Sequence, residues 1–537
     1  QGFVVRHAAR TFMDCKEPLL RSDWAIYRGG AFLLTGTEHI QILDAEFDQV
    51  GGNAIFVNHY NRRTLVKGCH IHDCGASGVC FVGDPDAVRD PLFEYGQKND
   101  LASIDRTPGP KTDNYPAKSA VEDCLMLGIG RVERQPAGVM MDMASEITVR
   151  DCSIYECARS GINIGDGAWG GHLIERCDVF DTVLETHDHG SFNSWGRDRY
   201  WRSDHLTASQ AAVDVEPNLP FLDAVKTTVI RDSRWRCDHG WDIDLDDGSS
   251  NYDIYNNLML NRGLKLREGF RRHAWNNVSP FGRLHPHVWF RRSRDKVTGN
   301  IFADSHATAR MSTPYVDDTT VDRNFFASED EGILERSATL GWDKHSVLGD
   351  PKFIDPDKGD FRVQDDSPAL KLGFINFAMD QFGVKKPALK AIARTPELGH
   401  EPAGPDRGVR VAVQVKPVKR SWLGAVLRDL QGGEFSAYGV SKEEGGVALA
   451  NVPKNSAAAK AGLRANDLIQ AVNGTPVTNI GQLLKRLTDS KSASVTLKVV
   501  RDQKATERAI ELPWIVVTET ASAANRFSKL PVPATSK

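Results

Sequence analysis

A short unit of apolar and polar positions recurs along the first two thirds of the chain. In this unit an aliphatic residue is followed three positions later by Cys, Ser or Asn, and a small or turn residue then leads into a second β-branched run. Copies occur at Val66/Cys69, Val121/Cys124, Val149/Cys152, Ile174/Cys177, Ile230/Ser233, Ile254/Asn257, Ala274/Asn277, Val297/Asn300 and Val321/Asn324. Most neighbouring copies lie about 20 to 30 residues apart, which is the period of a solenoid with several short strands per turn. A longer gap at 83–118 predicts an inserted loop.

Short strands, frequent Gly and Asn turns and the lack of a long amphipathic helix predict a mainly β fold, a right-handed parallel β-helix. Equivalent positions of successive turns should stack, so the interior is expected to contain a ladder of cysteines followed by a ladder of asparagines. We expect Cys69, Cys124, Cys152 and Cys177 to be buried and inert, because no CxxC motif indicates zinc.

Residues 240–248 alternate strictly between apolar and acidic side chains. This alternation predicts a β-strand with two different faces. The buried face would carry Trp241, Ile243 and Leu245, and the other face Asp242, Asp244 and Asp246. Because adjacent like charges destabilise a strand, we interpret the acidic face as the floor of a site.

The neighbouring turns extend this strand into a surface. Residues 213–216 in the preceding turn and 264–267 in the following turn have the same alternation, which predicts two columns of outward side chains. The first column is Asn163, Asn193, Asp214, Asp242 and Lys265, and the second is Glu216, Asp244 and Arg267. Neighbours would lie about 4.8 Å apart across strands and about 6.6 Å apart along one strand. At least one carboxyl group in such a cluster should have a raised pKa and carry a proton near neutral pH.

A protonated acid beside an ionised carboxylate is the pair that glycosidic-bond hydrolysis requires. We expect Asp242 or Asp244 to act as general acid, and Asp214, Glu216 or the other acid of the central strand as base or nucleophile. Lys265 and Arg267 would bind hydroxyl groups or an acidic sugar. Further substrate contacts are expected from His187, Asp188, His189, Asn193, Trp195, His285, His287 and Trp289.

Two other interpretations of the acidic strand remain open. The acids could form structural ion pairs, Asp242 with Lys265 and Asp244 with Arg267. They could also bind calcium, although Asp247 occupies the position at which a calcium loop of the EF-hand type needs glycine. Zinc binding by His187 and His189 is a weaker alternative, so no metal or cofactor is predicted.

Charge and hydropathy exclude two classes of partner. The 537 residues have a formal net charge of −4, which gives no electrostatic basis for binding nucleic acid or an anionic membrane surface. No run of 18 apolar residues predicts a membrane span. The chain starts with Gln and no signal-like segment follows, so we expect a processed form or one without its leader.

The C-terminal region has a different pattern. The run GLRANDLIQAVNG at 462–474 resembles the core signature of PDZ domains, and the resemblance extends from about Tyr438 to Leu512. It implies strands at 446–449 and 494–501 and helices at 458–461 and 480–487. Asn466 replaces a usual glycine and can adopt a positive φ. The resemblance also implies that Tyr438-Gly439-Val440 binds a peptide C-terminus by strand addition, with a purely structural docking role as the alternative.

These patterns divide the chain into four parts. We predict a β-helix at 1–345, a closing coil, cap and linker at 346–430, a PDZ-like domain at 431–515 and a tail at 516–537.

The β-helical region is similar to bacterial carbohydrate-active proteins, and most similar to glycoside hydrolase family 141, which includes α-L-fucosidase and xylanase activities. The similarity covers about residues 30–345 and rests on the runs HDHGSFN at 187–193, DLDDGSSNY at 244–252, LKLREG at 264–269 and HPHVW at 285–289. It implies a carbohydrate substrate and a periplasmic or extracellular location.

Two further functions remain open besides glycan hydrolysis. The first is a polysaccharide lyase, with Lys265 as base and Arg267 neutralising a uronate carboxylate. The second is a non-enzymatic glycan-binding or adhesion solenoid that uses the PDZ-like domain for docking.

Overall fold

The computed structural model describes residues 1–11, 14, 17–21, 25–203, 208–311, 318–398, 421–430, 434–441, 443–490, 494–501 and 504–511. The chain forms two compact units. The first comprises Gln1–Ala412 and Gly432–Ala437, and the second Val413–Gln431 and Tyr438–Lys537. The predicted tail and most of the predicted linker lie outside the described residues, and the four boundaries drawn from the sequence stay predictions.

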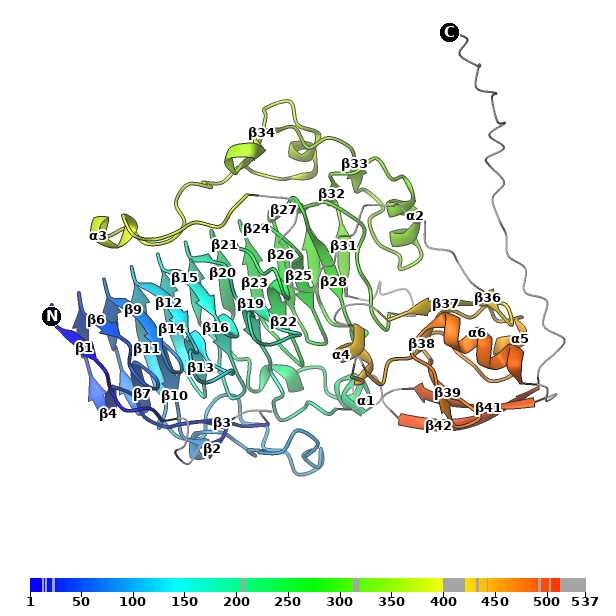
Figure 1. Ribbon diagram of the computed structural model, residues 1–537, viewed down its shortest axis with the longest axis horizontal. Coiled ribbons are helices and arrows are strands. Elements are labelled where there is room, and N and C mark those ends of the chain that lie inside the picture. The colour runs from blue at the N-terminus through cyan, green and yellow to red at the C-terminus, as the bar shows by residue number, and fades with distance from the viewer. Residues whose placement is uncertain are drawn as a thin grey trace, which may run out of the picture. The chain divides into compact units, whose positions relative to one another are not determined.

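The first unit is built from short strands of successive repeats that pair in parallel (Figure 1). One sheet has 12 strands, and its register places Ile71 beside Met126, Met126 beside Ile154 and Ile154 beside Val179. In chain order its strands are β1 (Val4–Arg6), β6 (Glu46–Asp48), β9 (His70–Cys74), β12 (Leu125–Ile129), β15 (Ser153–Cys157), β18 (Asp178–Val179), β21 (Arg234–Trp235), β24 (Leu258–Met259), β27 (Val278–Ser279), β30 (Ile301–Phe302), β32 (Phe325–Phe326) and β33 (Val347–Leu348).

A second sheet has 19 strands, which form two series. Within each series the strands of successive repeats pair in parallel. The series that carries the acidic strand consists of β4 (Phe32–Glu38), β7 (Ile55–Arg62), β10 (Val79–Val82), β13 (Ala137–Asp142), β16 (Ser160–Ile164), β19 (Gly190–Ser194), β22 (Trp241–Leu245), β25 (Gly263–Leu266) and β28 (Arg283–Pro286). The other series consists of β5 (Gln41–Leu43), β8 (Leu65–Lys67), β11 (Pro116–Glu122), β14 (Ser145–Arg150), β17 (Leu173–Glu175), β20 (Thr228–Arg231), β23 (Tyr252–Tyr255), β26 (Arg272–Trp275), β29 (Lys296–Thr298) and β31 (Thr320–Asp322).

The remaining elements of the first unit are few and short. They are the antiparallel pairs β2 (Glu17–Pro18) with β3 (Ala25–Ile26) and β34 (Phe353–Asp355) with β35 (Asp360–Val363), the helices α1 (Ala208–Val215), α2 (Gly332–Ala338) and α3 (Pro387–Lys390), and the 3₁₀ turns η1 (Pro85–Ala87), η2 (Leu219–Phe221), η3 (Pro356–Lys358) and η4 (Pro368–Leu372). The predicted mainly β fold with long parallel sheets is therefore confirmed. The predicted insertion lies between β10 and β11.

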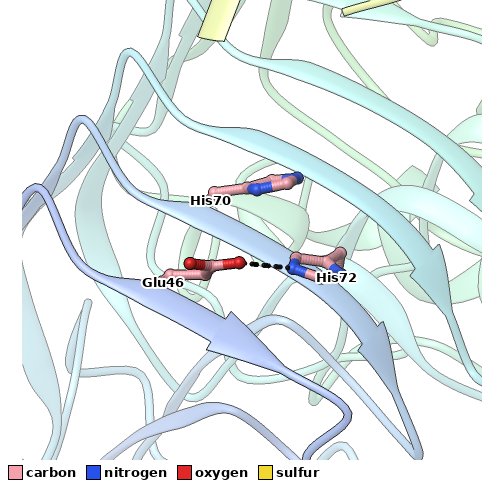
Figure 2. A group of neighbouring side chains, drawn as sticks. All are labelled: Glu46, His70 and His72. Atoms are coloured by element: carbon pink, nitrogen blue, oxygen red, sulfur yellow. Dashed lines mark hydrogen bonds and ion pairs between the residues drawn. The ribbon is translucent and has the colours of Figure 1, made fainter. Parts of the chain in front are cut away.

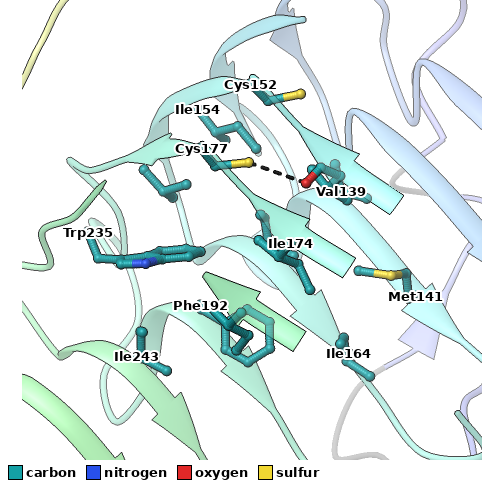
Figure 3. Packing of buried hydrophobic residues seen from close by; sticks show 14 of the residues in the cluster. Val139, Met141, Cys152, Ile154, Ile164, Ile174, Cys177, Phe192, Trp235 and Ile243 are labelled. Atoms are coloured by element: carbon teal, nitrogen blue, oxygen red, sulfur yellow. Dashed lines mark hydrogen bonds between the residues drawn. The ribbon is translucent and has the colours of Figure 1, made fainter. Parts of the chain in front are cut away.

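The interior contains the two predicted ladders. Cys152 and Cys177 lie in the apolar core, and each thiol donates to a carbonyl of the preceding turn at 3.6 Å (Figure 3). Farther along the chain Asn257 donates to Asn277 at 3.0 Å, and Asn277 donates to Asn300 at 2.9 Å. All these side chains are buried. Each asparagine therefore bonds the next turn through its side chain, which fixes the stacking register inside the core.

We expect Asn277→Ala to lower the free energy of unfolding of the first unit by about 3 kcal/mol, because it leaves the buried backbone N–H of Asn257 without its acceptor and removes the side-chain hydrogen bonds to Asn257 and Asn300. Urea titration followed by tryptophan fluorescence measures the change. Asn218→Ala, at an exposed position whose side chain makes no capping bond, should change stability by less than about 0.5 kcal/mol. Equal effects of the two substitutions would contradict a structural role for the ladder.

The second unit has a sheet in the order β36-β37-β38-β39-β41-β42, with β40 beside β39. Its elements are β36 (Ser421–Trp422), β37 (Ala425–Asp429), β38 (Val447–Asn451), α5 (Ala457–Lys460), β39 (Leu468–Val472), β40 (Thr475–Pro476), α6 (Ile480–Asp489), β41 (Ser494–Arg501) and β42 (Lys504–Glu511). Asn466 has φ = 67°, as its replacement of glycine predicts.

The predicted carboxylate-binding loop is placed differently. Tyr438 is the last residue of α4 (Glu434–Tyr438), and the next strand starts only at Val447. A peptide-binding loop of a PDZ domain must lead into the strand that the peptide extends. The turn between β36 and β37 does so, and both Leu423 (φ = 52°) and Gly424 (φ = 79°) have positive φ there. The assignment to 438–440 is therefore wrong.

Candidate active site

Strand β22 lies between β19 and β25, and its register defines the outward column. Asn193 lies beside Asp244, Asp244 beside Lys265, and Lys265 beside His285. Asn163 precedes Asn193 in the same column. The predicted columns, with Asp242 beside Lys265 and Asp244 beside Arg267, are therefore wrong by two residues. A two-residue shift keeps every side chain on the same face, so alternation alone could not detect it.

The side chain of Asp242 is buried and has a structural role in the fold. Its carboxylate accepts the backbone N–H groups of Cys237 at 2.8 Å, Asn261 at 3.0 Å and Gly263 at 2.8 Å. Burial raises its pKa to about 7, although these three hydrogen bonds act in the opposite direction. Asp242 thus joins two turns, and the predicted presentation of its carboxylate to a substrate is wrong.

Lys265 is the centre of the charged cluster. Its Nζ lies 3.1 Å from Asp244 Oδ1, 3.1 Å from Asp246 Oδ1 and 3.6 Å from Asp188 Oδ1. The ammonium also lies 4.1 Å from the ring centroid of Trp241. Trp241 is buried as predicted, but it packs on this cation and not in the core with the apolar residues of its strand. Three carboxylates therefore converge on one ammonium group.

The pKa shifts follow from this arrangement. Burial raises the pKa of Asp244 well above its usual range, and the neighbouring carboxylates of Asp246 and Asp188 raise it further, while Lys265 opposes the shift. Burial acts to lower the pKa of Lys265, but the three carboxylates outweigh it and raise this pKa. Lys265 is therefore a fixed cation, and the carboxyl group of Asp244 retains a proton more readily than free aspartate does.

A second cation continues the cluster. Arg267 Nε lies 3.0 Å from Asp247, and its Nη1 lies 3.6 Å from Asp246. Arg197 Nε lies 3.1 Å from the other oxygen of Asp247. Arg197 comes from the loop that follows β19, and no repeat pattern connects it with Asp247 in the sequence. Asp246 is thus shared between Lys265 and Arg267.

The histidines lie around Trp241. The rings of His285 and His287 meet its ring edge-on at 6.0 and 5.9 Å. Burial lowers the pKa of His285 to about 3, and its Nε2 lies 2.9 Å from the Arg262 carbonyl, to which the neutral ring donates. Burial also lowers the pKa of His189 well below its usual range. The neutral rings of His285 and His189 can donate to or accept from hydroxyl groups.

His187 is exposed and directly precedes Asp188 of the cluster. Trp195 is buried, with the guanidinium groups of Arg159 and Arg197 at 5.1 and 5.4 Å from its ring. The calcium alternative fails geometrically, because Asp242 accepts backbone N–H groups while Asp244 and Asp246 contact Lys265.

Three predicted site residues lie elsewhere. Asp214 is on helix α1 and pairs with Arg291 at 2.9 Å, and Glu216, just after it, pairs with Arg106 at 3.0 Å. The predicted strand at 213–216 is wrong, because 208–215 (ASQAAVDV) forms a helical turn within a long excursion between β19 and β20. Trp289 is in the core, where its Nε1 donates to the Leu266 carbonyl at 2.6 Å.

At the cluster, two buried side chains that carry no ion pair have a donor without an acceptor among the described residues. They are Nδ2 of Asn193 and Nε1 of Trp241. Asn193 lies beside Asp244, and Trp241 packs on Lys265. Because buried donors are normally satisfied, these two groups are suited to bind a polar ligand or water at the cluster.

A groove of about 960 Å³ lies on the neighbouring strand series. Arg271, His273, Arg294, Lys296 and Asn251 are among its lining residues. It does not include the carboxylate cluster, so the hollow surface and the clustered carboxylates are separate features of adjacent strands.

Comparison with known proteins identifies the second unit. Residues 450–501 match the family model of the PDZ domain. The second unit contains a PDZ domain. A probable periplasmic serine endoprotease DegP-like of Pseudomonas savastanoi pv. phaseolicola is 33% identical over 105 residues, which is 18% of this chain and 21% of that protein. Periplasmic serine endoprotease DegP of Salmonella typhimurium is 27% identical over 175 residues, 30% of this chain and 36% of that protein. The chain therefore spans about a fifth to a third of these relatives.

Among solved structures, one titled glycoside hydrolase matches with a TM-score of 0.25 and 11% identity, over 61% of this chain and 37% of that chain. No helix among the described residues is long and apolar enough to cross a membrane.

We expect Lys265→Met to lower the free energy of unfolding at pH 8 by about 3–5 kcal/mol, because three carboxyl groups lose a buried cation. The folded-state pKa of Asp244 should then rise further above the unfolded value, because Lys265 no longer opposes the shift. A group with a raised folded-state pKa loses its stabilising contribution as pH rises through that value, so the loss should shrink at pH 5.

Urea unfolding at the two pH values measures this difference. Lys226→Met removes an exposed pair with Glu146 and should cost less than about 1 kcal/mol at either pH. A pH-independent loss in Lys265→Met would contradict the influence of Lys265 on the pKa of Asp244.

Proposed function

We propose that the first unit is a glycan hydrolase whose stacked turns form a right-handed parallel β-helix, with its active site around Lys265. The observation that supports this most directly is the convergence of Asp188, Asp244 and Asp246 on one buried ammonium. Such a cluster holds a protonated carboxyl group beside an ionised one, and general-acid catalysis of glycosidic-bond cleavage needs that combination.

Exposure supports the following roles within the cluster. The side chains of Asp244 and Lys265 are 0% exposed, whereas those of Asp246 and Asp188 are 14% and 33% exposed. Asp246, which contacts the same ammonium as Asp244 and is more exposed, is proposed as the general acid, and Asp188 as the base or nucleophile. Asp244 and Lys265 are positioning residues that act through these two.

The spacing is compatible with retention of configuration at the cleaved carbon. Asp246 Oδ1 and Asp188 Oδ1 lie 3.1 and 3.6 Å from the same nitrogen, so these oxygens are at most about 6.7 Å apart. Retaining pairs are separated by about 5–5.5 Å, and inverting pairs by about 6.5–9.5 Å. Most of the allowed range thus lies below the inverting distance.

The lyase alternative is less well supported. A lyase would need Lys265 to accept a proton from the carbon next to a uronate carboxylate, but the surrounding acids raise the pKa of Lys265 and keep it protonated. Its complete burial also separates the amine from a sugar ring.

We expect Asp246→Asn and Asp188→Asn each to reduce glycan cleavage at least about 100-fold, because each removes one member of the acid–base pair. Incubation with a panel of plant and algal glycans, followed by reducing-end and ultraviolet assays, measures the loss. Asp365→Asn, at an exposed position of the same unit, is the matched control. Full activity in both site variants would refute the proposal, and ultraviolet-absorbing products would establish a lyase instead.

The PDZ unit is proposed to bind a peptide C-terminus at the turn between β36 and β37. Two successive residues with positive φ, Leu423 and Gly424, orient backbone N–H groups as an anion-binding nest, and β37 provides the strand to be extended. A non-enzymatic docking role for this unit is the alternative. With relatives that are periplasmic by name, we also propose a periplasmic or extracellular location.

We expect peptides selected from a library with free C-termini to lose at least about tenfold in affinity when amidated, because the nest then faces no carboxylate. Fluorescence anisotropy measures this on the whole chain. Gly424→Ala should weaken binding similarly, since a side chain at φ = 79° disturbs the turn. Gly474→Ala introduces comparable strain at φ = 74° in open surroundings and should leave binding intact. Equal affinity for amidated peptides would contradict this proposal.

A further inference from the structure

A cluster of histidines and carboxylates lies on the 12-stranded sheet, apart from the carboxylates around Lys265. Strands β6 and β9 pair so that Glu46 lies beside His70 and Asp48 beside His72. The residues between them, Phe47 and Ile71, are in the core. Strand alternation therefore directs the four polar side chains away from the core. The proposed hydrolase uses none of them.

Figure 2 shows the three side chains as neighbours, with Glu46 facing His72. One ligand atom from each of Glu46, His70 and His72 lies within 4.8 Å of the other two. The two imidazole rings are stacked, with centroids 4.2 Å apart and planes at 27°. Tetrahedral zinc, with bonds of about 2.0–2.2 Å, places its ligand atoms roughly 3.4 Å apart. Small side-chain rotations would close the observed arrangement to that spacing.

Carboxylates face both ring nitrogens of His72. Nε2 lies 3.2 Å from Glu46 Oε1, while Nδ1 lies 3.2 Å from Asp73 Oδ2 and 3.6 Å from Asp48 Oδ1. A neutral imidazole has one proton, so if Nδ1–H donates to Asp73, a lone pair on Nε2 faces the Glu46 carboxylate. A cation between Nε2 and Glu46 relieves that repulsion. The carboxylate behind Nδ1 then orients the ring, as carboxylates commonly do for metal-binding histidines.

The local charge leaves Glu46 available. Asp48 pairs with Arg6, and Asp73 lies 3.7 Å from Arg131. In the described part of the chain, the recorded ion pairs of Glu46 involve His72 alone. The Glu46 side chain is 41% exposed, so an ion can enter from solvent.

We propose that Glu46, His70 and His72 bind a divalent transition-metal ion, zinc in the first place. Asp73 orients His72 through Nδ1, and solvent occupies the fourth position. The ion joins two consecutive turns from the outside, as the asparagine ladder joins later turns from the inside, and so stabilises the N-terminal part of the first unit.

Isothermal titration of the metal-free whole chain with zinc chloride tests the proposal. We expect saturable binding that His72→Ala and His70→Ala abolish, and that Glu46→Gln weakens at least about tenfold. Asp73→Asn should weaken it about 10- to 100-fold by releasing the ring. His39→Ala, at an exposed position outside the cluster, should bind as the unsubstituted chain does.

Cobalt chloride provides a second readout that does not depend on affinity. Cobalt in a site of two histidines and one carboxylate should give visible absorption bands, and His72→Ala should lose them. Circular dichroism without metal checks that each variant is folded. Undiminished zinc binding and unchanged cobalt bands in folded His72→Ala, or no binding by the unsubstituted chain, would overturn the proposal. Asp246→Asn should keep the metal site, so failure of the hydrolase proposal is separate from failure of this one.

Discussion

Side-chain hydrogen bonding between stacked turns is the constraint on which the first unit depends. The backbone hydrogen bonds of a parallel strand pair do not fix its register, so side chains must do so. In this chain the interior asparagine ladder sets the register. Asn257, Asn277 and Asn300 each bond the next asparagine at 2.9–3.0 Å within a dry core. A shift by one residue would leave these amides unpaired and turn the apolar residues outward, so the interior fixes which outward side chains become neighbours.

That fixed register makes the charged cluster possible. Bringing several carboxylates together in a buried position is unfavourable unless cations are held among them. Lys265 and Arg267 occupy the strand next to the acids and the loop after it, and the stacking places them against Asp244, Asp246 and Asp247. The stability of the core therefore supports an arrangement that would repel itself in isolation, and burial together with the neighbouring carboxylates raises the pKa of Asp244.

The sequence predicts features with a local or periodic signal and misses those that depend on register or on long loops. The cysteine and asparagine ladders and most PDZ elements follow from repeats, alternation and a distinctive motif, and the structure confirms them. The column through Asp242 was misplaced by two residues, because such a shift preserves alternation. Asp214 and Glu216 were assigned to a strand because the excursion after β19 interrupts the repeat. Arg197 and Asp247 meet only in three dimensions, so no pattern in the chain could pair them.

The two polar clusters differ in how their negative charge is balanced. The cations that neutralise the carboxylates around Lys265 are buried side chains of the chain itself, so this cluster needs no bound ion. What can still vary there is which group carries a proton. Around His72 the carboxylates face both nitrogens of a ring that is neutral or singly charged, and Glu46 is open to solvent. Stacked parallel strands can place either a lysine or histidines in a column beside carboxylates, at the same spacing. A lysine in the column balances carboxylates with a charge of the chain itself, whereas a histidine pair beside a solvent-exposed carboxylate suits the external cation that we propose, and one fold can support both in separate turns.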